Sequence, residues 1–517
     1  MRGHINDLLR SITGWTIVVL GLVSQRLLRF RMRGYTRNQE RLKRKYGITR
    51  DTPVLPYGPQ VVESIRSAVM KAGRTARFAQ TSGSTGKPKQ IPYTKRRLLS
   101  QKFTFSDMFA RACYAFGIKR TSLYVFNSFQ SDASLTSLLL DEHDSPNYFS
   151  TLQAPYRVQH NPAIRALVSK YGAAAVRLWI LTISNPGLLY ATNPSTISTF
   201  LDELASDWQQ ASRLIKDWCE APASFTPEVL KIARRLESRG CNERLKQIAT
   251  SYAPLPLSVC APAVEAYICW TGGYVKPFLD RLATHLPSAR YKLIPMYSMS
   301  TETIETLPDF RGEDVAFLPM AAGVVYEFIE ETALDRVDNL LNPHQLEPGK
   351  LYAMVVSDAY GLRRYQTDDL FLCKRKLKGL PDLAFGRRRS LEYSFTGEKL
   401  TAEQLTTVFE QLRAMYPSLL ANRFLTCVPI QPPGAVPHYQ LLLLGDQPSS
   451  SHDFIAARCD ELLSEINCEY RSKRSSGRLG PIECTQAEIR DFAERFENNA
   501  TWETQFKFIP LIRLKSR

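Results

Sequence analysis

The chain has 517 residues, of which 44% are apolar and 23% charged, and this balance excludes an intrinsically disordered protein. The length predicts two or more domains, because one hydrophobic core rarely serves so many residues. Ten cysteines are scattered without a CxxC pair, which predicts reduced cytoplasmic thiols rather than a disulfide framework or a zinc site. Neither HExxH nor GxSxG occurs, so zinc proteases and serine hydrolases lack their usual signatures.

The positive charge is concentrated at the N-terminus. The net charge is +17, and residues 1–50 hold 12 Lys/Arg against 2 Asp/Glu, a balance of +10. The same segment contains the apolar run GWTIVVLGLV (14–23), which is shorter than the roughly 20 residues of a membrane-spanning helix. We expect a helix that docks its apolar face on the body of the protein. The alternatives are a basic amphipathic helix lying on anionic lipid, and nucleic-acid binding, for which no recognised module is present.

Helical and extended patterns then alternate. The segments RFAQT (77–81) and KQIPYT (89–94) are extended and predict two strands joined by a loop. Thr94 is a suitable N-cap for a helix over 95–117. Large apolar residues at helical spacing predict one long helix over 193–218. Thr226 and Pro227 then open a helix that we expect to end at Gly240.

The second half is richer in strands. Strand-like runs cover 324–329, 351–357 and 369–374. After about residue 386 the pattern restarts with a helix that Thr401 and Gln404 open at capping-box spacing. Two strands (423–430 and 438–445) and a long helix (452–470) follow, which predicts a small α+β domain. We therefore divide the chain into an N-terminal segment, a large domain and a small domain, with a hinge at Arg387–Arg389: 1–50, 51–386 and 387–517.

The loop FAQTSGSTGKPKQIPYT (78–94) has the composition of a phosphate-binding loop. It is not a Walker A loop, because Thr81 replaces the first glycine and Pro88 follows Lys87. Gly83 and Gly86 allow a tight bend whose amides point at phosphate oxygens. Further donors and positive charges for a triphosphate or pyrophosphate come from Ser82, Ser84, Thr85, Lys87 and Lys89. The alternative is a basic hairpin turn.

The stretch TSGSTGKPK resembles the signature loop of the adenylate-forming superfamily, which includes acyl-CoA synthetases, peptide-synthetase adenylation domains and luciferases. Further segments follow in the order typical of one branch: WTGGY (270–274), YSMSTE (297–302), LPMAAGVVYEFIE (318–330), GLRRYQTDDL (361–370), FGRRRSLEYSFTGEK (385–399) and ETQFKFIPL (503–511). Over nearly its whole length the chain thus resembles the auxin-responsive-promoter family of acyl acid amido synthetases. The resemblance implies an α/β fold: a large N-terminal adenylate-forming domain of mixed sheets flanked by helices, plus a small mobile α+β C-terminal domain.

The resemblance also implies a two-step reaction with ATP and Mg2+. A carboxylate attacks the α-phosphate to give an acyl-adenylate, and an amine, typically that of an amino acid, then displaces AMP. We expect small-molecule substrates, no nucleic acid, and a cytoplasmic location with possible peripheral membrane contact through residues 1–50. The alternatives are thioester formation with coenzyme A, or a membrane-surface protein whose ATP site has decayed.

Site residues follow from matching these motifs. The resemblance implies that the loop residues Ser82, Gly83, Ser84, Thr85, Gly86 and Lys87 hold the phosphates, with Lys87 in a catalytic role. Glu302 is implied to be catalytic and to position magnesium, and Ser298 and Thr301 to bind the nucleotide. Asp369 is implied to bind the ribose, with Arg387 at the hinge beside the nucleotide. Lys399 is the implied catalytic lysine of the small domain, and Lys507 is a weaker candidate. The alternative interpretation of Glu302, Asp369 and Lys399 is that all three are solvated surface residues without a role in the site.

Three departures from the family pattern concern this site. Ser298 occupies a place where the family has an aromatic residue, with Tyr297 beside it. The usual Tyr-Arg-x-Gly-Asp is replaced by Tyr-Gln-Thr-Asp-Asp at 365–369. Ser390 replaces an asparagine at the hinge. These changes predict a distant branch of the family or a site adapted to another acceptor.

Overall fold

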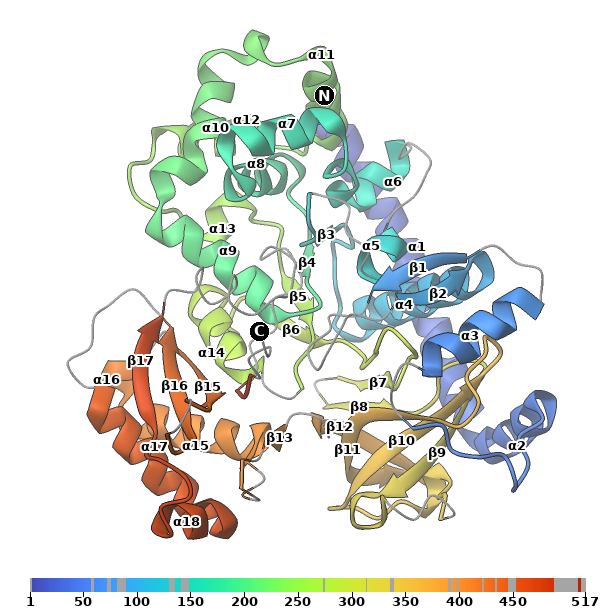
Figure 1. The fold of residues 1–517 in the computed structure, drawn as a ribbon. Helices are drawn as coiled ribbons and strands as arrows, with labels where there is room; N and C mark the ends of the chain where they lie inside the picture. Colours follow the sequence, from blue (N-terminus) through green and yellow to red (C-terminus); the bar gives the residue numbers. More distant parts are fainter. Residues whose placement is uncertain are drawn as a thin grey trace.

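The computed structural model describes residues 2–56, 60–71, 76–80, 90–129, 135–140, 148–272, 275–312, 314–334, 339–388, 392–393, 395–396, 398, 400–420, 423–432, 435–444, 452–487 and 510–512. Figure 1 shows a helical lobe built on a parallel sheet, a β-rich lobe and a small C-terminal domain. The described part is thus an α/β protein with mixed sheets, as predicted.

A four-stranded parallel sheet lies in the middle of the N-terminal part. Its order is β3-β4-β5-β6, with β3 (Leu123–Val125), β4 (Leu188–Tyr190), β5 (Ala266–Cys269) and β6 (Lys292–Pro295). The strands are short and apolar because helices cover the sheet. All four carboxyl ends lie at one edge, which is where open parallel sheets bind ligands.

Most of the helices around this sheet lie in the upper part of Figure 1, and α14 lies lower, towards the small domain. They are α5 (Leu135–Leu140), α6 (Tyr148–Gln153), α7 (Pro162–Tyr171), α8 (Ala173–Ser184), α9 (Pro194–Ser206), α10 (Trp208–Glu220), α11 (Pro227–Leu236), α12 (Cys241–Thr250), α13 (Leu257–Cys260) and α14 (Lys276–His285). The single helix predicted over 193–218 is wrong, because Asp207 leaves the helical conformation and its side chain accepts from the Gln210 amide to cap α10. The predicted end of α11 at Gly240 is also wrong, because Gly240 (φ 70°) begins α12.

The β-rich lobe contains an antiparallel sheet of order β12-β11-β10-β9. Its strands are β9 (Val324–Glu330), β10 (Leu351–Asp358), β11 (Tyr365–Leu377) and β12 (Leu380–Arg388), and the hairpin β7 (Leu307–Arg311)–β8 (Asp314–Leu318) lies beside it. The three predicted strands are confirmed, although β11 starts four residues earlier than expected. The two strands predicted around the phosphate loop are also confirmed: β1 (Ala76–Gln80) pairs antiparallel with β2 (Gln90–Thr94).

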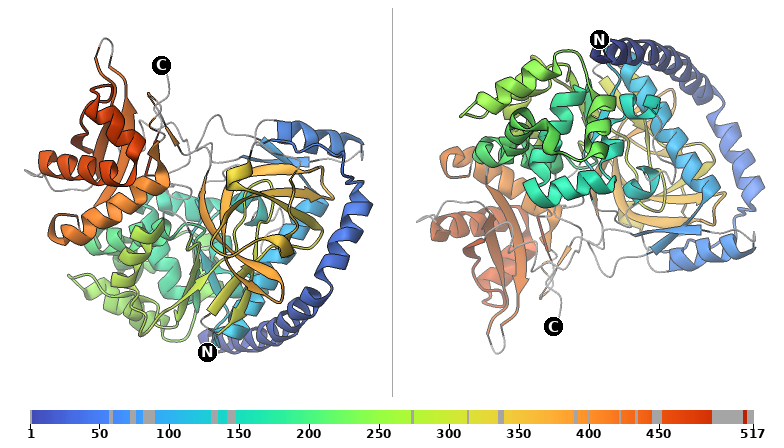
Figure 2. Two further views of the ribbon diagram at one scale, coloured as in Figure 1. Left: turned by 90° about the horizontal axis from the view of Figure 1, so that it is seen from below. Right: turned by 90° about the horizontal axis from the view of Figure 1, so that it is seen from above.

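Two helices, α1 (Arg2–Arg33) and α2 (Tyr35–Tyr46), follow the outer rim of the large domain, as both views of Figure 2 show. α1 lies against α4 (Lys95–Ala115), which Thr94 caps as predicted. The expected docking on the body is confirmed, but only part of the apolar face is buried: Leu28 and Met32 are buried, and Ile17 and Val18 are partly buried against the core. The other residues that α1 buries are small or polar: Gly3, Asn6, Arg10, Gly14, Gly21 and Gln25. By length and composition alone, the helix from Gly3 to Arg33 is long enough to cross a membrane, which the ten-residue run did not predict.

The small domain has its own core. β15 (Phe424–Ile430), β16 (His438–Leu444) and β17 (Glu483–Ala487) form a sheet, accompanied by β13 (Glu392–Tyr393), β14 (Leu400–Thr401), α15 (Ala402–Met415), α16 (Pro417–Leu420), α17 (His452–Ile466) and α18 (Cys468–Ser475). The capping box of Thr401 and Gln404 is confirmed. The helix predicted over 452–470 is wrong, because Asn467 interrupts it and caps α18. The rings of Phe278 and Phe424 stack at 4.6 Å and join this domain to α14.

Candidate active site

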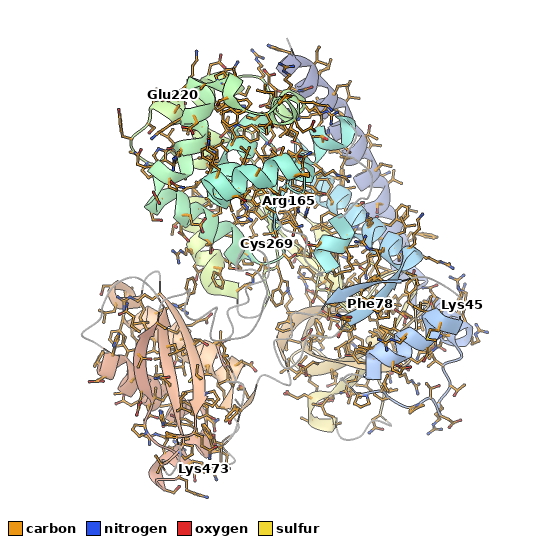
Figure 3. All side chains as sticks on the ribbon, turned by 45° about the horizontal axis from the view of Figure 1, so that its top comes forward. Lys45, Phe78, Arg165, Glu220, Cys269 and Lys473 are labelled. Atoms are coloured by element: carbon orange, nitrogen blue, oxygen red, sulfur yellow. The ribbon has the colours of Figure 1, made fainter. Side chains whose placement is uncertain are left out.

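The segment after β6 carries the candidate residues Ser298, Thr301 and Glu302 to the carboxyl edge of the parallel sheet. The Met296 amide donates to the carbonyl oxygen of Cys269 at 3.0 Å, so this segment leaves the sheet beside the end of β5. Cys269 is labelled in Figure 3 near the middle of the molecule, where the helical lobe approaches the small domain. The segment therefore lies where a ligand of this sheet is expected.

Glu302 lies beside β2, the strand that follows the predicted phosphate loop. The Tyr93 hydroxyl donates to the carbonyl oxygen of Thr301 at 2.7 Å, and Arg97 Nη2 donates to the carbonyl oxygen of Glu302 at 2.5 Å. Arg97 Nη1 donates to the Pro92 carbonyl oxygen at 3.2 Å. Two segments that are about 200 residues apart in the sequence are thus joined at this point.

Arg97 also reaches the end of β10. Its guanidinium lies 4.0 Å from the carboxylate of Asp358 and 4.3 Å from the centre of the Tyr93 ring. Burial raises the pKa of Asp358, although the Arg97 charge opposes that shift. Asp358 begins the turn that leads into β11, because its Oδ1 accepts from the amides of Tyr360 and Leu362. Arg97 therefore links the Glu302 segment to the turn that precedes Asp369.

Asp369 lies on β11 opposite Arg388 of β12, and the next pair is Leu370 with Arg387. The backbone of the predicted hinge arginine is thus adjacent to that of the predicted ribose ligand. Asp368 and Asp369 are both largely buried, at 8% and 7% exposure. The pairing of β10 with β11 shifts its register between Ala353–Leu370 and Val355–Gln366, so both acids lie in an irregular part of β11.

The WTGG turn packs on the strand that enters the hinge. The rings of Trp270 and Phe385 meet edge to face at 5.2 Å. A Cβ atom on Gly272 would lie 3.3 Å from the Phe385 Cβ and 3.2 Å from the Trp270 indole nitrogen, so glycine permits this close approach. The end of β5 and the end of β12 are therefore held together next to Arg387.

Ser298 has a structural role in its own segment. Its hydroxyl hydrogen-bonds the carboxylate of Glu305, and its amide donates to Thr306 Oγ1 at 3.1 Å. The neighbouring Tyr297 is 1% exposed, and burial raises the pKa of its phenol. Tyr297 is thus a core residue in this structure and does not supply the exposed aromatic face that the family pattern has near position 298.

Several predicted residues lie outside the described part of the chain, namely Ser82 to Lys87, Lys89, Lys399 and Lys507. The structure does describe Glu398, which precedes Lys399. Tyr439 donates to Glu398 Oε1 at 2.6 Å, and the amides of Phe395 and Thr396 donate at 2.7 and 2.9 Å. Burial opposes ionisation of Glu398, but these hydrogen bonds bring its pKa below the usual value. The turn that leads to Lys399 is therefore anchored in the small domain.

Sequence reasoning missed Tyr93, Arg97, Asp358 and Glu398. Arg97 belongs to the run KRR (95–97), which has the composition of a solvated helix start, and yet Arg97 is 2% exposed. Only Glu398 had a usable signal, because it lies inside the TGEK motif (396–399).

The whole fold is similar to that of a solved acyl acid amido synthetase. The structure of GH3.15 acyl acid amido synthetase matches with a TM-score of 0.65 and 17% identity, over 90% of this chain and 84% of that chain. A structure of AtGH3.15 in complex with 2,4-DB matches with a TM-score of 0.67 and 16% identity, over 89% and 84% of the two chains. The chain therefore has the fold of these acyl acid amido synthetase structures.

Family models identify the particular branch. The GH3 family N-terminal domain matches residues 34–290, the central domain 317–388 and the C-terminal domain 403–515. The chain belongs to the GH3 family. Indole-3-acetic acid-amido synthetase GH3.3 of Arabidopsis thaliana is 25% identical over 239 residues, 42% of this chain and 38% of that protein. Indole-3-acetic acid-amido synthetase GH3.8 of Oryza sativa subsp. indica is 24% identical over 196 residues, which are 35% of this chain and 32% of that protein. The aligned stretches thus span about a third of the curated relatives.

Proposed function

We propose that this protein adenylates a carboxylic acid with ATP and transfers the acyl group to an amine, most simply that of an amino acid. The observation that carries the proposal is the pair of contacts from Tyr93 and Arg97 to Thr301 and Glu302. These contacts bring the predicted metal-positioning acid next to the strand that follows the predicted phosphate loop. Membership of a family whose curated relatives are named amido synthetases supports the same activity.

In the first step, a carboxylate oxygen of the substrate attacks the α-phosphorus of ATP, the bond to the bridging oxygen breaks, and pyrophosphate leaves. In the second step, the amine nitrogen attacks the acyl carbon, AMP leaves with the former carboxylate oxygen, and the amine proton passes to solvent. Negative charge develops on the phosphates in the first step, so the loop amides and Lys87 have a stabilising role there. Lys399 has a matching role from the small domain.

The residues present fit a magnesium ion. Within the described residues, no three His, Cys, Asp or Glu side chains are grouped as a metal site, and Glu302 carries a buried carboxylate. One or two carboxylates suffice for Mg2+ when substrate phosphates and water supply its other ligands. Bound there, magnesium would neutralise phosphate charge. Glu302 would hold it, Asp369 would bind the ribose, and Ser298, Thr301 and Arg387 would line the nucleotide site.

We further propose that residues 51–386 and 387–517 act as the large and small catalytic domains, and that the protein works in the cytoplasm. All ten cysteines are free in the structure, which supports a reducing compartment. Two separate apolar cores, one in each part, support the division.

The test is acid-dependent release of pyrophosphate from ATP and Mg2+, with hydroxylamine to trap the adenylate as a hydroxamate. We expect at least one acid of a broad panel to give a hydroxamate, and amino acids to replace hydroxylamine as acceptors. Product formation with coenzyme A but with no amino acid would favour thioester formation instead. Tight ATP binding without pyrophosphate exchange for any acid would indicate a decayed site.

A further inference from the structure

The solvent-facing side of α1 is unusually apolar. Nine large apolar side chains on it are 47–73% exposed: Ile5, Leu8, Ile12, Trp15, Val19, Leu20, Val23, Leu27 and Phe30. They recur mainly at intervals of three and four residues, so they form one continuous face, which we call the apolar stripe. With a rise of about 1.5 Å per residue, the stripe is roughly 40 Å long. Figure 2 shows that α1 lies on the outer rim, where none of the described elements covers it.

The inner side of α1 fixes this orientation. Asn6 donates to the Glu237 carbonyl oxygen at 2.6 Å, Arg10 to the Leu236 carbonyl oxygen at 2.8 Å, and Gln25 to the Phe310 carbonyl oxygen at 3.2 Å. A Cβ on Gly21 would lie 2.0 Å from the Ala110 carbonyl oxygen, so the backbones touch there. Rotating the helix to bury the stripe would strand these polar groups. The helix thus lies on the protein with the apolar stripe outward, while Leu28 and Met32 pack inward near its C-terminal end.

The charge on the helix that carries the stripe is almost entirely positive. Asp7 is the one acid of α1, and it is paired with Arg10 and Arg120. At the C-terminal end of the stripe, a cavity of about 850 Å³ opens at the junction of α1 and α2. Four exposed arginines and Phe30 line it together with Met320–Gly323; the arginines are Arg31, Arg33, Arg37 and Arg41. Phe30 belongs to both the stripe and this cationic cavity.

We propose that the apolar stripe and the cationic cavity form a docking surface for an anionic lipid bilayer. α1 lies in the plane of the interface, the stripe enters the acyl region, and the arginines bind lipid phosphates. A second copy of the chain fits less well. A two-fold interface pairs the same surface with itself, and this surface would bring arginines together without an acid on α1 to meet them. The proposal is independent of the catalytic reaction, because vesicle binding is measured without ATP.

The test is flotation of the full chain with vesicles of phosphatidylcholine, and of phosphatidylcholine with phosphatidylserine. We expect at least tenfold stronger binding to the anionic vesicles. The triple variant W15S/L20S/F30S should lose binding at least tenfold, as should R33E/R37E/R41E, and neither change removes a core side chain. Matched controls are M70S/F103S/Y252S and R213E/R234E/K246E, which change exposed residues elsewhere and should bind as the wild type does. Thermal unfolding confirms that all variants are folded.

Trp15, which is 73% exposed, provides a local signal. Anionic vesicles should shift the tryptophan emission to the blue, and W15F should lose that shift while still floating with vesicles. Absence of binding, or equal binding by the stripe variant and its control, would overturn the proposal. A dimer that does not bind vesicles and that W15S/L20S/F30S dissociates would also overturn the proposal, because a second copy would then cover the stripe. Wild-type protein that resists carbonate extraction would overturn it too, because α1 would then cross the membrane.

Discussion

Arg97 Nη2 donates to the carbonyl oxygen of Glu302 at 2.5 Å, while the same guanidinium lies 4.0 Å from the Asp358 carboxylate. With its bond to the Pro92 carbonyl oxygen, this side chain joins β2, the segment after β6 and the end of β10. The candidate active site is assembled from these three segments, so its geometry depends on a residue that itself has no assigned chemistry.

Replacing Arg97 with methionine should therefore destabilise the protein by about 3–5 kcal/mol, because Asp358 would remain buried without its cation. Acid-dependent pyrophosphate release should fall with it, since the Glu302 segment loses its support. Urea unfolding and the hydroxamate assay measure the two effects. Arg96→Met is the matched control, because Arg96 is exposed and should lose less than about 0.5 kcal/mol. Equal effects of the two changes would contradict a special role for Arg97.

The adjacent acids Asp368 and Asp369 separate two interpretations of β11. Asp369→Asn should weaken ATP binding by about ten- to a hundredfold, because one hydrogen bond to a charged acceptor contributes roughly 1.5–3 kcal/mol. Asp368→Asn should leave ATP affinity within about twofold, because the family resemblance assigns ribose binding to Asp369 alone. Calorimetric titration with ATP measures both. If Asp368→Asn alone weakens binding, the ribose ligand has been assigned to the wrong carboxylate.

Glu398 should make the small domain sensitive to acid. Its pKa is lowered in the folded protein, so the ionised form stabilises the fold fully above the unfolded pKa of about 4.5. That contribution is lost as the pH falls through the folded pKa. Glu398→Gln should cost about 1–3 kcal/mol at neutral pH and flatten the pH dependence of unfolding in this acid range. Thermal melts between neutral pH and acid check this, and an unchanged slope in the variant would refute it.

Gly21 should be intolerant of any side chain. A Cβ there would lie 2.0 Å from the Ala110 carbonyl oxygen, so Gly21→Ala should push α1 away from α4 and destabilise their contact by about 1–3 kcal/mol. Limited proteolysis of α1 and thermal unfolding measure this effect. Gly34→Ala is the control, because a Cβ at Gly34 would meet no described atom within 4 Å and its φ of −103° suits alanine. Because alanine favours a helix more than glycine does, an equal loss of stability in both variants would contradict a specific α1–α4 contact at Gly21.

Much of the fold could be predicted from local patterns. The β1–β2 hairpin, the strands β9 to β11 and the caps at Thr94, Thr226 and Thr401 depend on neighbouring residues, and the structure confirms them. The helix breaks at Asp207 and Asn467 were missed because apolar spacing continues through both, while each side chain caps the following helix. A cap inside a periodic segment has no strong signal in a single sequence.

By itself the sequence determined the family and the order of the motifs, because a glycine- and hydroxyl-rich loop and its companion segments are local features of composition and spacing. The tertiary structure decided which groups meet: Arg97 with Glu302 and Asp358, Trp270 with Phe385, and Glu398 with Tyr439. It also decided that α1 turns its polar side inward. The reason is that the carbonyl oxygens and the close backbone contacts that select that face come from residues roughly 100 to 300 positions away, and no local pattern contains them.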